Sequence, residues 1–568
     1  MDRKSLLFIG ALITIGFLTY AFNLNNELFW DDDDWIIGNS NVHSLSGENI
    51  KNIFTKDILS GFGLNSNYYR PLLLISFAFN WVLHGSSPFG YHVVSNLFHI
   101  GNAILIFLLL AWALKSCRAA FIASLLWLVH PLNVEAVAYI SGRGDPMSVF
   151  FVLGGFLLFI KSQSLIHNSK FLILSLLAMI LAVLSRETAI LFPALAMVFY
   201  LSFLIKSHIT MSNIVMAFKK TLPFWGISAF YMLLRLTVLN FQNTLNFYNE
   251  SNLYTEHLSY RLYTFSHALV EYFKLMFWPT GLHMERNLAV NTSLFQWPVW
   301  LGFLVVVLII AIGWYFYRSQ MSKWPSGKSM ENGNWKMENS NFKIWFFAWS
   351  WFFIAIAPVS GIIPINAIMY EHWLYLPLIG LVALVGFYLD RILSFLKDNK
   401  FVISHLSLVI ALVAYLSFFS IATMSRNLAW GNKISFYEDI LKYNPDTVRV
   451  INNLGNAYSA KGDLEKAAGM YEKAIQLPDG QMFAQPYYNL ANVYRDQKRP
   501  QEASEMYKKA IEVDPSFPFA YKNLAILYAQ YGYFQEAINV LNAYKKIWPD
   551  DPAIDEAIRR LMEDLKNN

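Results

Sequence analysis

The chain has 568 residues, of which 55% are hydrophobic, 17% aromatic and only 15% charged. About a quarter of the residues in an ordinary soluble domain are charged, so this composition excludes a soluble globular protein and predicts a polytopic membrane protein. The net charge of +5 is modest, and we expect no nucleic acid among the partners. Cys117 is the only cysteine, which excludes an intrachain disulfide and a cysteine-based metal site.

Apolar segments of about 20 residues, the length that crosses a bilayer, recur through residues 1–424. The first has no small-residue cleavage site after it and is expected to remain as a signal anchor. Two further apolar pieces, 72–83 and 263–277, are interpreted as interfacial helices. The segments predict an all-α bundle of about eleven spans, near residues 5–24, 90–113, 118–133, 146–161, 170–185, 187–206, 217–239, 298–317, 344–363, 373–393 and 401–424.

Basic residues recur at alternate junctions of these segments. They include Lys115 with Arg118, Lys161 with Lys170, Lys219 with Lys220, Arg318 through Lys343, and Arg391 through Lys400. Positive residues in short loops stay cytoplasmic, so the amino end is expected inside and everything after residue 424 outside. In a bacterial inner membrane that side is the periplasm, and in a eukaryotic ER membrane it is the lumen.

Four adjacent aspartates, Asp31, Asp32, Asp33 and Asp34, follow the first apolar segment and lie between two tryptophans. Four like charges repel, so the run is stable only if the carboxylates stay hydrated, bind a cation, or raise a pKa enough to make one of them a base. Taken alone, the run is typical of a hydrated loop. Clustered carboxylates also suit a hard divalent cation, although no cage-like spacing demands one.

The acidic run belongs to a predicted first outer loop, residues 25–89. Other polar clusters fall at the predicted outer ends of helices. Each alone is equally typical of an interfacial ion pair or an exposed helix terminus. Together they indicate one shared cavity. The clusters are Tyr69-Arg70-Pro71, Pro88-Phe89-Gly90-Tyr91-His92, His130-Pro131 with Glu135, Gly142-Arg143-Gly144-Asp145, Arg186-Glu187 and Glu371-His372.

The carboxy-terminal part repeats every 34 to 36 residues. Asn453-Leu454-Gly455 returns as Asn489-Leu490-Ala491 and Asn523-Leu524-Ala525, and small residues follow in step at Ala467, Ala503 and Ala537. This is the tetratricopeptide pattern of two antiparallel helices per unit. We expect about three units and a capping helix over 449–568, after a linker or degenerate leading repeat over 425–448. Such grooves bind extended peptides or helices, which favours a protein or peptide partner.

The order of the motifs resembles the transmembrane and tetratricopeptide repeat-containing O-mannosyltransferase family, which belongs to the GT-C glycosyltransferases. The resemblance covers nearly the whole chain. It rests on the acidic run, Tyr69-Arg70-Pro71-Leu72, Pro88 to His92 with Asn96 and His99, His130-Pro131 with Glu135-Ala136-Val137, Gly142-Arg143 with Asp145, Arg186-Glu187-Thr188, Glu371 with Leu374-Tyr375-Leu376-Pro377, and the repeats.

The resemblance implies a GT-C-like membrane domain over residues 1–424, with a catalytic acidic pair in the first outer loop. The implied donor is a sugar, mannose or another hexose, on polyprenyl or dolichyl phosphate. The family's spacing to Ile36 and Asn39 places the pair at Asp31 and Asp32 and leaves two aspartates over. Where relatives have Glu-Arg-Tyr, this chain has Glu371-His372-Trp373, which weakens a phosphate role at His372.

Sugar transfer to a hydroxyl needs a base for the hydroxyl proton and cations for the leaving phosphate. Asp32 or Asp31 is the predicted base, and a single displacement would invert the anomeric centre. Arg143 and Arg186 are the predicted phosphate partners, supported by Arg70 and His130. The remaining candidates for the substrate site are His92, Glu135, Asp145, Glu187, Glu371, His372 and Tyr375.

Two other functions remain open. A membrane-anchored tetratricopeptide scaffold for envelope assembly would explain the repeats, although a single span would anchor it. A polysaccharide ligase or polymerase also joins lipid-linked sugars outside the membrane, and it differs in using a lipid diphosphate oligosaccharide as donor. The acceptor, a protein or a glycan, cannot be read from any residue.

Overall fold

The computed structural model describes residues 2–164, 169–205, 209–241, 252–286, 288–322, 341–365 and 367–567. Every regular element in these residues is a helix, which confirms the predicted all-α class. The chain divides into two compact units, Met1–Gly431 and Asn432–Asn568.

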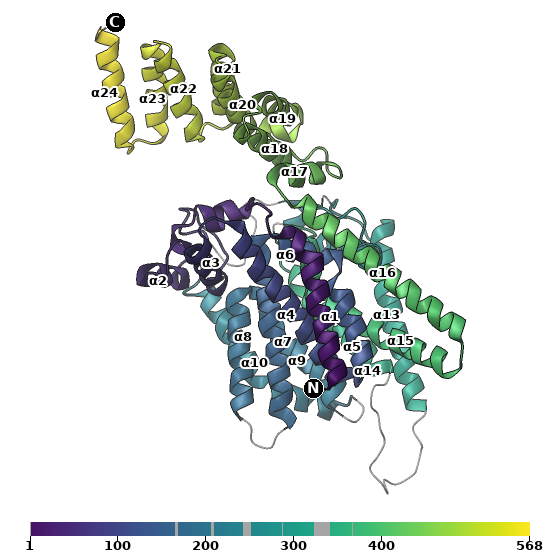
Figure 1. Cartoon of the computed structure of the whole chain (residues 1–568). Coiled ribbons are helices and arrows are strands. Elements are labelled where there is room, and N and C mark those ends of the chain that lie inside the picture. The colour runs from purple at the N-terminus through teal and green to yellow at the C-terminus, as the bar shows by residue number, and fades with distance from the viewer. Residues whose placement is uncertain are drawn as a thin grey trace. The chain divides into compact units, whose positions relative to one another are not determined.

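The first unit is a bundle of long apolar helices (Figure 1). In the described residues, eight unbroken helical segments are candidates for membrane spans. The bent pair α5 (Cys117–Leu128) and Pro131–Ala138 would be a ninth if it forms a single span. Among the described residues, the eight helical segments long and apolar enough to cross a membrane are Arg3–Asn23, Pro88–Leu114, Ile140–Gln163, Glu187–Leu204, Trp297–Ser319, Asn341–Val359, Leu378–Asp398 and Val402–Ala429.

The predicted number of about eleven spans is therefore too high for the described residues. The predicted span 118–133 bends by 54° at Pro131, because proline lacks the amide hydrogen that a continuous helix needs. The predicted span 170–185 is α8 (Ser169–Ser185), which has only 17 residues. The predicted span 217–239 falls on α10 (Met211–Leu236), which contains Lys219, Lys220 and Arg235. All three segments are helical. They differ from the other predicted spans because the first is bent, α8 is short and α10 carries three basic residues.

The two pieces interpreted as interfacial are α3 (Pro71–His84) and α12 (Leu258–Phe277), and neither is among the span candidates. The other helices of this unit are α1 (Arg3–Tyr20), α2 (Gly47–Thr55), α4 (Pro88–Leu114), α6 (Val134–Ala138), α7 (Gly144–Ser164), α9 (Phe192–Phe199), α11 (Leu253–Glu256), α13 (Trp297–Ser322), α14 (Asn341–Ile356), α15 (Leu378–Asp398) and α16 (Val402–Ala429), with short 3-10 or π turns between them.

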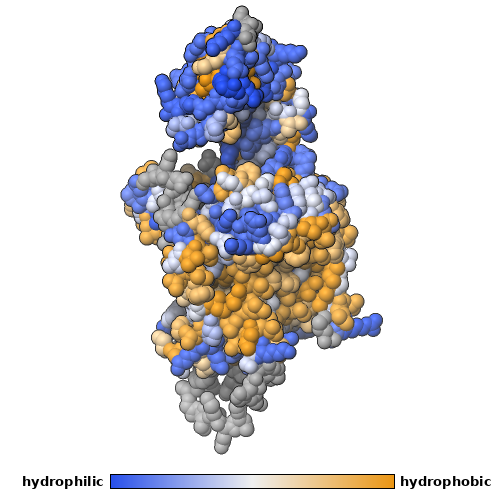
Figure 2. Space-filling model, turned by 90° about the vertical axis from the view of Figure 1, so that its left-hand side faces the viewer, coloured by the Kyte–Doolittle hydropathy of each residue, from blue (hydrophilic) through white to orange (hydrophobic). Residues whose placement is uncertain are grey.

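The two ends of this bundle differ in character. Figure 1 shows the amino terminus at one end and α3 and α6 at the other. At the first end the first turn of α5 holds Arg118, which pairs with Asp390 in the second half of α15. Figure 2 shows a mainly hydrophobic surface along the middle of the bundle, with hydrophilic side chains near its ends. That band is what a bilayer requires, and we call the end with α3 and α6 the polar end.

The second unit is a stack of antiparallel helix pairs. Small residues predicted at the helix crossings, Ala467, Ala503 and Ala537, are fully buried. Gly462 and Gly532 make their inter-helix turns with φ of 81° and 77°, a conformation that glycine adopts at little cost. The helices are α17 (Lys433–Leu441), α18 (Val448–Ala460), α19 (Leu464–Gln476), α20 (Ala484–Asp496), α21 (Pro500–Val513), α22 (Pro518–Gln530), α23 (Phe534–Ile547) and α24 (Pro552–Asn567).

Candidate functional site

The acidic run begins a short helical turn at the polar end of the bundle. Trp30 takes the left-handed backbone conformation with φ of 63°, and the following aspartates start the turn. Asp32 is only 2% exposed. Its Oδ1 accepts hydrogen bonds from the backbone N–H of Ser141, at 2.7 Å, and from the Ser141 hydroxyl, while Oδ2 accepts from the Phe29 N–H at 3.3 Å. Asp32 therefore ties the loop that follows α1 to the segment before α7.

Burial raises the pKa of Asp32 to about 7, although the hydrogen bonds from Ser141 and Phe29 act in the opposite direction. An aspartate in an unfolded chain titrates near 3.9, so the folded protein holds the Asp32 proton more tightly than the unfolded chain does. The stabilisation that comes from this proton is complete below pH ~4 and is lost as the pH rises through about 7.

We therefore expect the Asp32→Asn variant, which cannot ionise, to lack this part of the pH dependence. Between pH 5 and pH 8, about the range in which Asp32 titrates, the melting temperature of the wild type should fall relative to that of the variant. Thermal unfolding of both proteins in the same detergent measures the difference at each pH. A constant offset between the two curves would contradict the expectation.

Asp31 is placed differently from Asp32. It is partly exposed, and its charge reaches two tyrosines at the polar end, Tyr68 and the buried Tyr139. Burial raises the pKa of Tyr68, and the charges of Arg70, Glu187, Arg186 and Asp31 also act on this phenol. Asp31 is therefore the member of the predicted catalytic pair that lies near cationic side chains and remains accessible.

The four aspartates do not fit a divalent cation as they are arranged. Both carboxylate oxygens of Asp32 face N–H or O–H donors, whereas a cation needs free oxygen lone pairs. No group of three or more His, Cys, Asp or Glu side chains in the described part of the chain is arranged to hold a metal ion. We assign no step of a reaction to a metal at this run.

Two arginines and one histidine, which is a cation only when both ring nitrogens carry hydrogen, share one design at the polar end. A buried or half-buried carboxylate anchors each of them. They come from connecting segments, before α3, after α8, and in the 3-10 turn Glu371–Leu374. The pairs are Arg70 Nε to Glu187 Oε2 at 2.9 Å, Arg186 Nη1 to Asp145 Oδ2 at 2.6 Å, and His372 Nδ1 to Glu135 Oε1 at 2.6 Å. We call these six residues the anchored cations and their carboxylates.

Each anchored cation keeps donors that its carboxylate does not use. The side chains of Arg70, Arg186 and His372 are 9%, 11% and 14% exposed. In the described parts of the chain, the Arg70 Nη atoms and His372 Nε2 have no hydrogen-bond partner. Neither appears among the buried polar atoms that lack a partner, so solvent reaches them. Donors of this kind are what a phosphate requires.

The three pairs lie close to one another. Asp145 is within electrostatic reach of Arg186, His372, Arg70 and Glu135. Residues from α6, α7, the α8 end and two loops therefore converge on one place. These predicted clusters therefore lie together at one end of the bundle, and the shared cavity stays a prediction.

Glu371 has a different surrounding from the three anchored pairs. It is fully buried, and its oxygens contact Arg286 Nη2 at 3.0 Å and Arg426 Nη2 at 3.1 Å. Its own N–H donates to Glu135 at 3.1 Å. With cations on both sides, Glu371 fixes the loop that holds His372. Neither arginine was predicted as a site residue. Arg426 could have been, because it follows the last predicted span directly, at a helix end of the kind that holds the other polar clusters.

Arg143, a predicted phosphate partner, is fully buried and turned into the protein. Its donors go to Ser95 Oγ at 3.1 Å, to Ser76 Oγ at 3.1 Å and Asn80 Oδ1 at 2.8 Å, and to the Tyr91 carbonyl at 2.9 Å. All these acceptors are neutral and all hold the helix ends around Arg143 together. A side chain in this position cannot contact a substrate without rearrangement.

Three other predicted residues also lie in packed surroundings. His92 Nε2 is 3.0 Å from the Asn26 carbonyl, and His130 Nε2 is 3.0 Å from the Met276 carbonyl. The Tyr375 hydroxyl lies 2.8 Å from His99 Nδ1. These contacts orient helices, so we keep none of the three for direct substrate contact.

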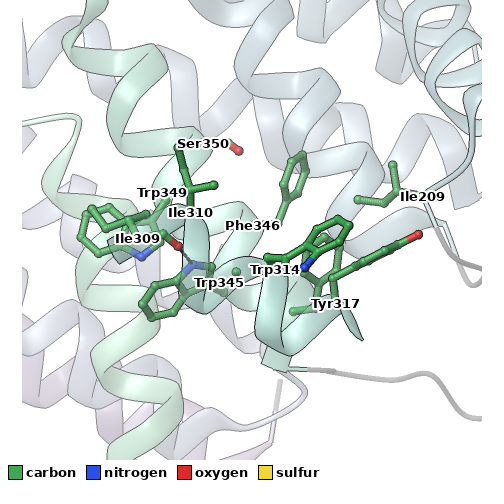
Figure 3. Close-up of a pocket in the computed structure, with 11 residues that line it drawn as sticks. Ile209, Ile309, Ile310, Trp314, Tyr317, Trp345, Phe346, Trp349 and Ser350 are labelled. Carbon is green, nitrogen blue, oxygen red and sulfur yellow. Dashed lines mark hydrogen bonds between the residues drawn. The ribbon is translucent and has the colours of Figure 1, made fainter. Parts of the chain in front are cut away.

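A hollow of about 430 Å³ lies between α13 and α14 (Figure 3), and none of the anchored cations lines it. Aromatic and aliphatic side chains line it, with Ser350 and Gly313, and no lining residue is an acid, lysine, arginine or histidine. Tyr317 is therefore the one side chain of this lining that could act as an acid or a base, and the lining offers no cation for a phosphate.

The comparisons with known proteins agree with the repeat pattern of the second unit. Family models described as tetratricopeptide repeat match residues 450–481 and 484–517. Among solved structures, a crystal structure of the MamA protein covers 23% of this chain and 72% of its own, at 24% identity. Its TM-score of 0.22 is too low to inform the fold.

Three curated relatives match most of the chain. Protein O-mannosyl-transferase TMTC3 of Mus musculus is 22% identical over 80% of this chain and 50% of its own length. Protein O-mannosyl-transferase Tmtc1 of Drosophila melanogaster is 25% identical over 82% and 61%, and protein O-mannosyl-transferase tmtc2 of Xenopus laevis is 24% identical over 81% and 61%. The chain thus spans about half to three-fifths of the length of these relatives. Over about four-fifths of its length, this chain is therefore similar to proteins named protein O-mannosyl-transferase.

Proposed function

We propose that this chain is a membrane glycosyltransferase that moves a sugar, mannose by the names of its relatives, from a polyprenyl or dolichyl phosphate to a protein hydroxyl. The observation that supports it most is the set of three anchored cations beside Asp31 at one end of a membrane bundle. A lipid-phosphate donor presents its phosphate at that depth while its tail stays among the apolar helices.

The proposed reaction is a single displacement. The acceptor oxygen bonds to the anomeric carbon as the bond from that carbon to the phosphate oxygen breaks. Asp31 takes the hydroxyl proton, and the lipid phosphate leaves with the electron pair. Arg70 and Arg186 hold the phosphate, since both keep N–H groups outside their ion pairs. Displacement from one face inverts the anomeric centre, as in a GT-C enzyme.

Asp32 takes a supporting part in this proposal. Its hydrogen bonds to Ser141 and Phe29 hold the turn that carries Asp31. The polar end is proposed to face outward, into a periplasm or an ER lumen, because the opposite end carries the basic junctions. The tetratricopeptide unit is proposed to bind a protein acceptor or partner. A scaffold alone would not need buried ion pairs with free donors.

A donor panel tests the proposal. The purified full chain in nanodiscs should transfer mannose to a Ser/Thr peptide from dolichyl-phosphate mannose, and at most at background level from a lipid diphosphate oligosaccharide or GDP-mannose. The glycopeptide is measured by mass spectrometry. Transfer from the lipid diphosphate would favour the ligase or polymerase instead, and no transfer from any donor would favour the scaffold.

A further inference from the structure

His372 is held more rigidly than an exposed loop histidine would be. Its Nδ1 is 2.6 Å from Glu135 Oε1, and Glu135 is fully buried. The second oxygen of Glu135 accepts the N–H of Glu371 at 3.1 Å. The ring of Tyr370 stacks on the imidazole, with centroids 5.2 Å apart and planes at 23°. Two contacts therefore fix the ring in position and rotation.

The other ring nitrogen, Nε2, is available. Because Nδ1–H faces the Glu135 carboxylate, Nε2 carries a hydrogen and can donate to a phosphate only in the doubly protonated imidazolium form. His372 Nε2 has no hydrogen-bond partner among the residues that the structure describes, and solvent reaches it. Two charged residues on neighbouring helices lie near His372. They are Glu135 on α6 and Asp145 on α7, and Asp145 is itself paired with Arg186. Nε2 is therefore a preoriented contact point beside the two arginines.

We propose that His372, through Nε2, is the third group that contacts the donor phosphate, and that Glu135 is its positioning residue. This inference rests on the proposed function for the identity of the phosphate. His372 shares the arrangement of Arg70 and Arg186. Each of the three side chains is anchored by one carboxylate on one side and keeps a free nitrogen on the other. The donor phosphodiester has two non-bridging oxygens, and a third oxygen gains negative charge as the bond to the sugar breaks, so three contacts from separate segments suit the departing phosphate better than two.

Binding of polyprenyl phosphate without a sugar tests this inference apart from transfer. In nanodiscs, His372→Gln should weaken the affinity for polyprenyl phosphate by about 10- to 100-fold, the loss expected for one hydrogen bond to a charged group. The affinity for polyprenol, which lacks the phosphate, should stay as in the wild type. His372→Arg, which restores a cation, should recover most of the lost affinity. The matched control is His405→Gln, near the start of α16 and outside the polar end.

Glu135 is tested by a double-mutant cycle. If Glu135 acts only by orienting His372, then Glu135→Gln should weaken the binding of polyprenyl phosphate but not of polyprenol. The double variant with His372→Gln should then be no weaker than His372→Gln alone. A merely structural role would lower the affinity for both lipids, and the two losses would add.

The inference is overturned if His372→Gln binds polyprenyl phosphate like the wild type, or if it loses the same affinity for polyprenol. These outcomes differ from a failure of the proposed function. A wild type that binds polyprenyl phosphate through His372 and transfers no sugar contradicts the function and supports the phosphate contact. A wild type that transfers sugar while His372→Gln binds and transfers equally well contradicts this inference alone.

Discussion

Replacing Asp31 by asparagine is expected to reduce sugar transfer by about 10²- to 10⁴-fold, the contribution of a positioned general base. Asparagine has nearly the same shape and cannot accept the hydroxyl proton, so the loss should appear in kcat. Asp31 is partly exposed, and asparagine keeps a side-chain oxygen that can accept hydrogen bonds in its place. Single-turnover rates with saturating dolichyl-phosphate mannose measure the effect.

The acidic run itself supplies the matched controls. Asp33→Asn and Asp34→Asn remove one charge each from the same turn, and both should keep most of the activity. Donor affinity should be close to that of the wild type in all three variants, because Arg70 and Arg186 still hold the phosphate. An Asp31→Asn protein with full activity would rule out Asp31 as the base, and a larger loss at Asp34 would move the base along the run.

The general architecture could be predicted from the sequence because its signals are local. Apolar length marks a bilayer helix, and a repeat of 34 to 36 residues marks a tetratricopeptide unit wherever it occurs. Lys498 illustrates the limit of such signals. It stands where Gly462 and Gly532 make the other turns, and it adopts the same left-handed conformation with φ of 59°. The repeat pattern, more than the residue type, determined that turn.

The roles within the site could not be predicted, because burial and direction decide them. Arg143 and Arg186 both follow a helix end in the sequence, yet one is enclosed by neutral acceptors and the other reaches solvent beside Asp145. Asp31 and Asp32 are adjacent, and the turn after Trp30 sends only Asp32 to Ser141. Neither difference follows from residue type or spacing.

For His372 the sequence argued against a role in phosphate binding, whereas its position in the structure favours one. Its substitution for the arginine of relatives weakened the prediction of a phosphate role at this position. The structure places it against Glu135 in the same arrangement as the two arginine pairs. A long-range contact across more than 230 residues carries this information, and no local pattern in one sequence can show such a contact.

Removing the Arg186 cation is expected to reduce kcat for transfer by about 10²- to 10³-fold, the effect of losing one donor that stabilises charge on a leaving oxygen. Arg186→Gln alone also leaves Asp145 without its cation. Both side chains are nearly buried, 11% and 12% exposed, and breaking such a pair costs about 3–5 kcal/mol. The single variant therefore mixes a catalytic loss with a loss of stability.

The double variant Arg186→Gln/Asp145→Asn separates the two effects, because two amides can still hydrogen-bond where the ion pair was. Its melting temperature should return toward that of the wild type while transfer stays low. The matched control is Arg118→Gln/Asp390→Asn, which neutralises an ion pair at the opposite end of the bundle and should leave transfer unchanged. Recovery of transfer together with stability in the Arg186/Asp145 double variant would show that this pair only holds the fold, and the phosphate would then depend on Arg70 and His372.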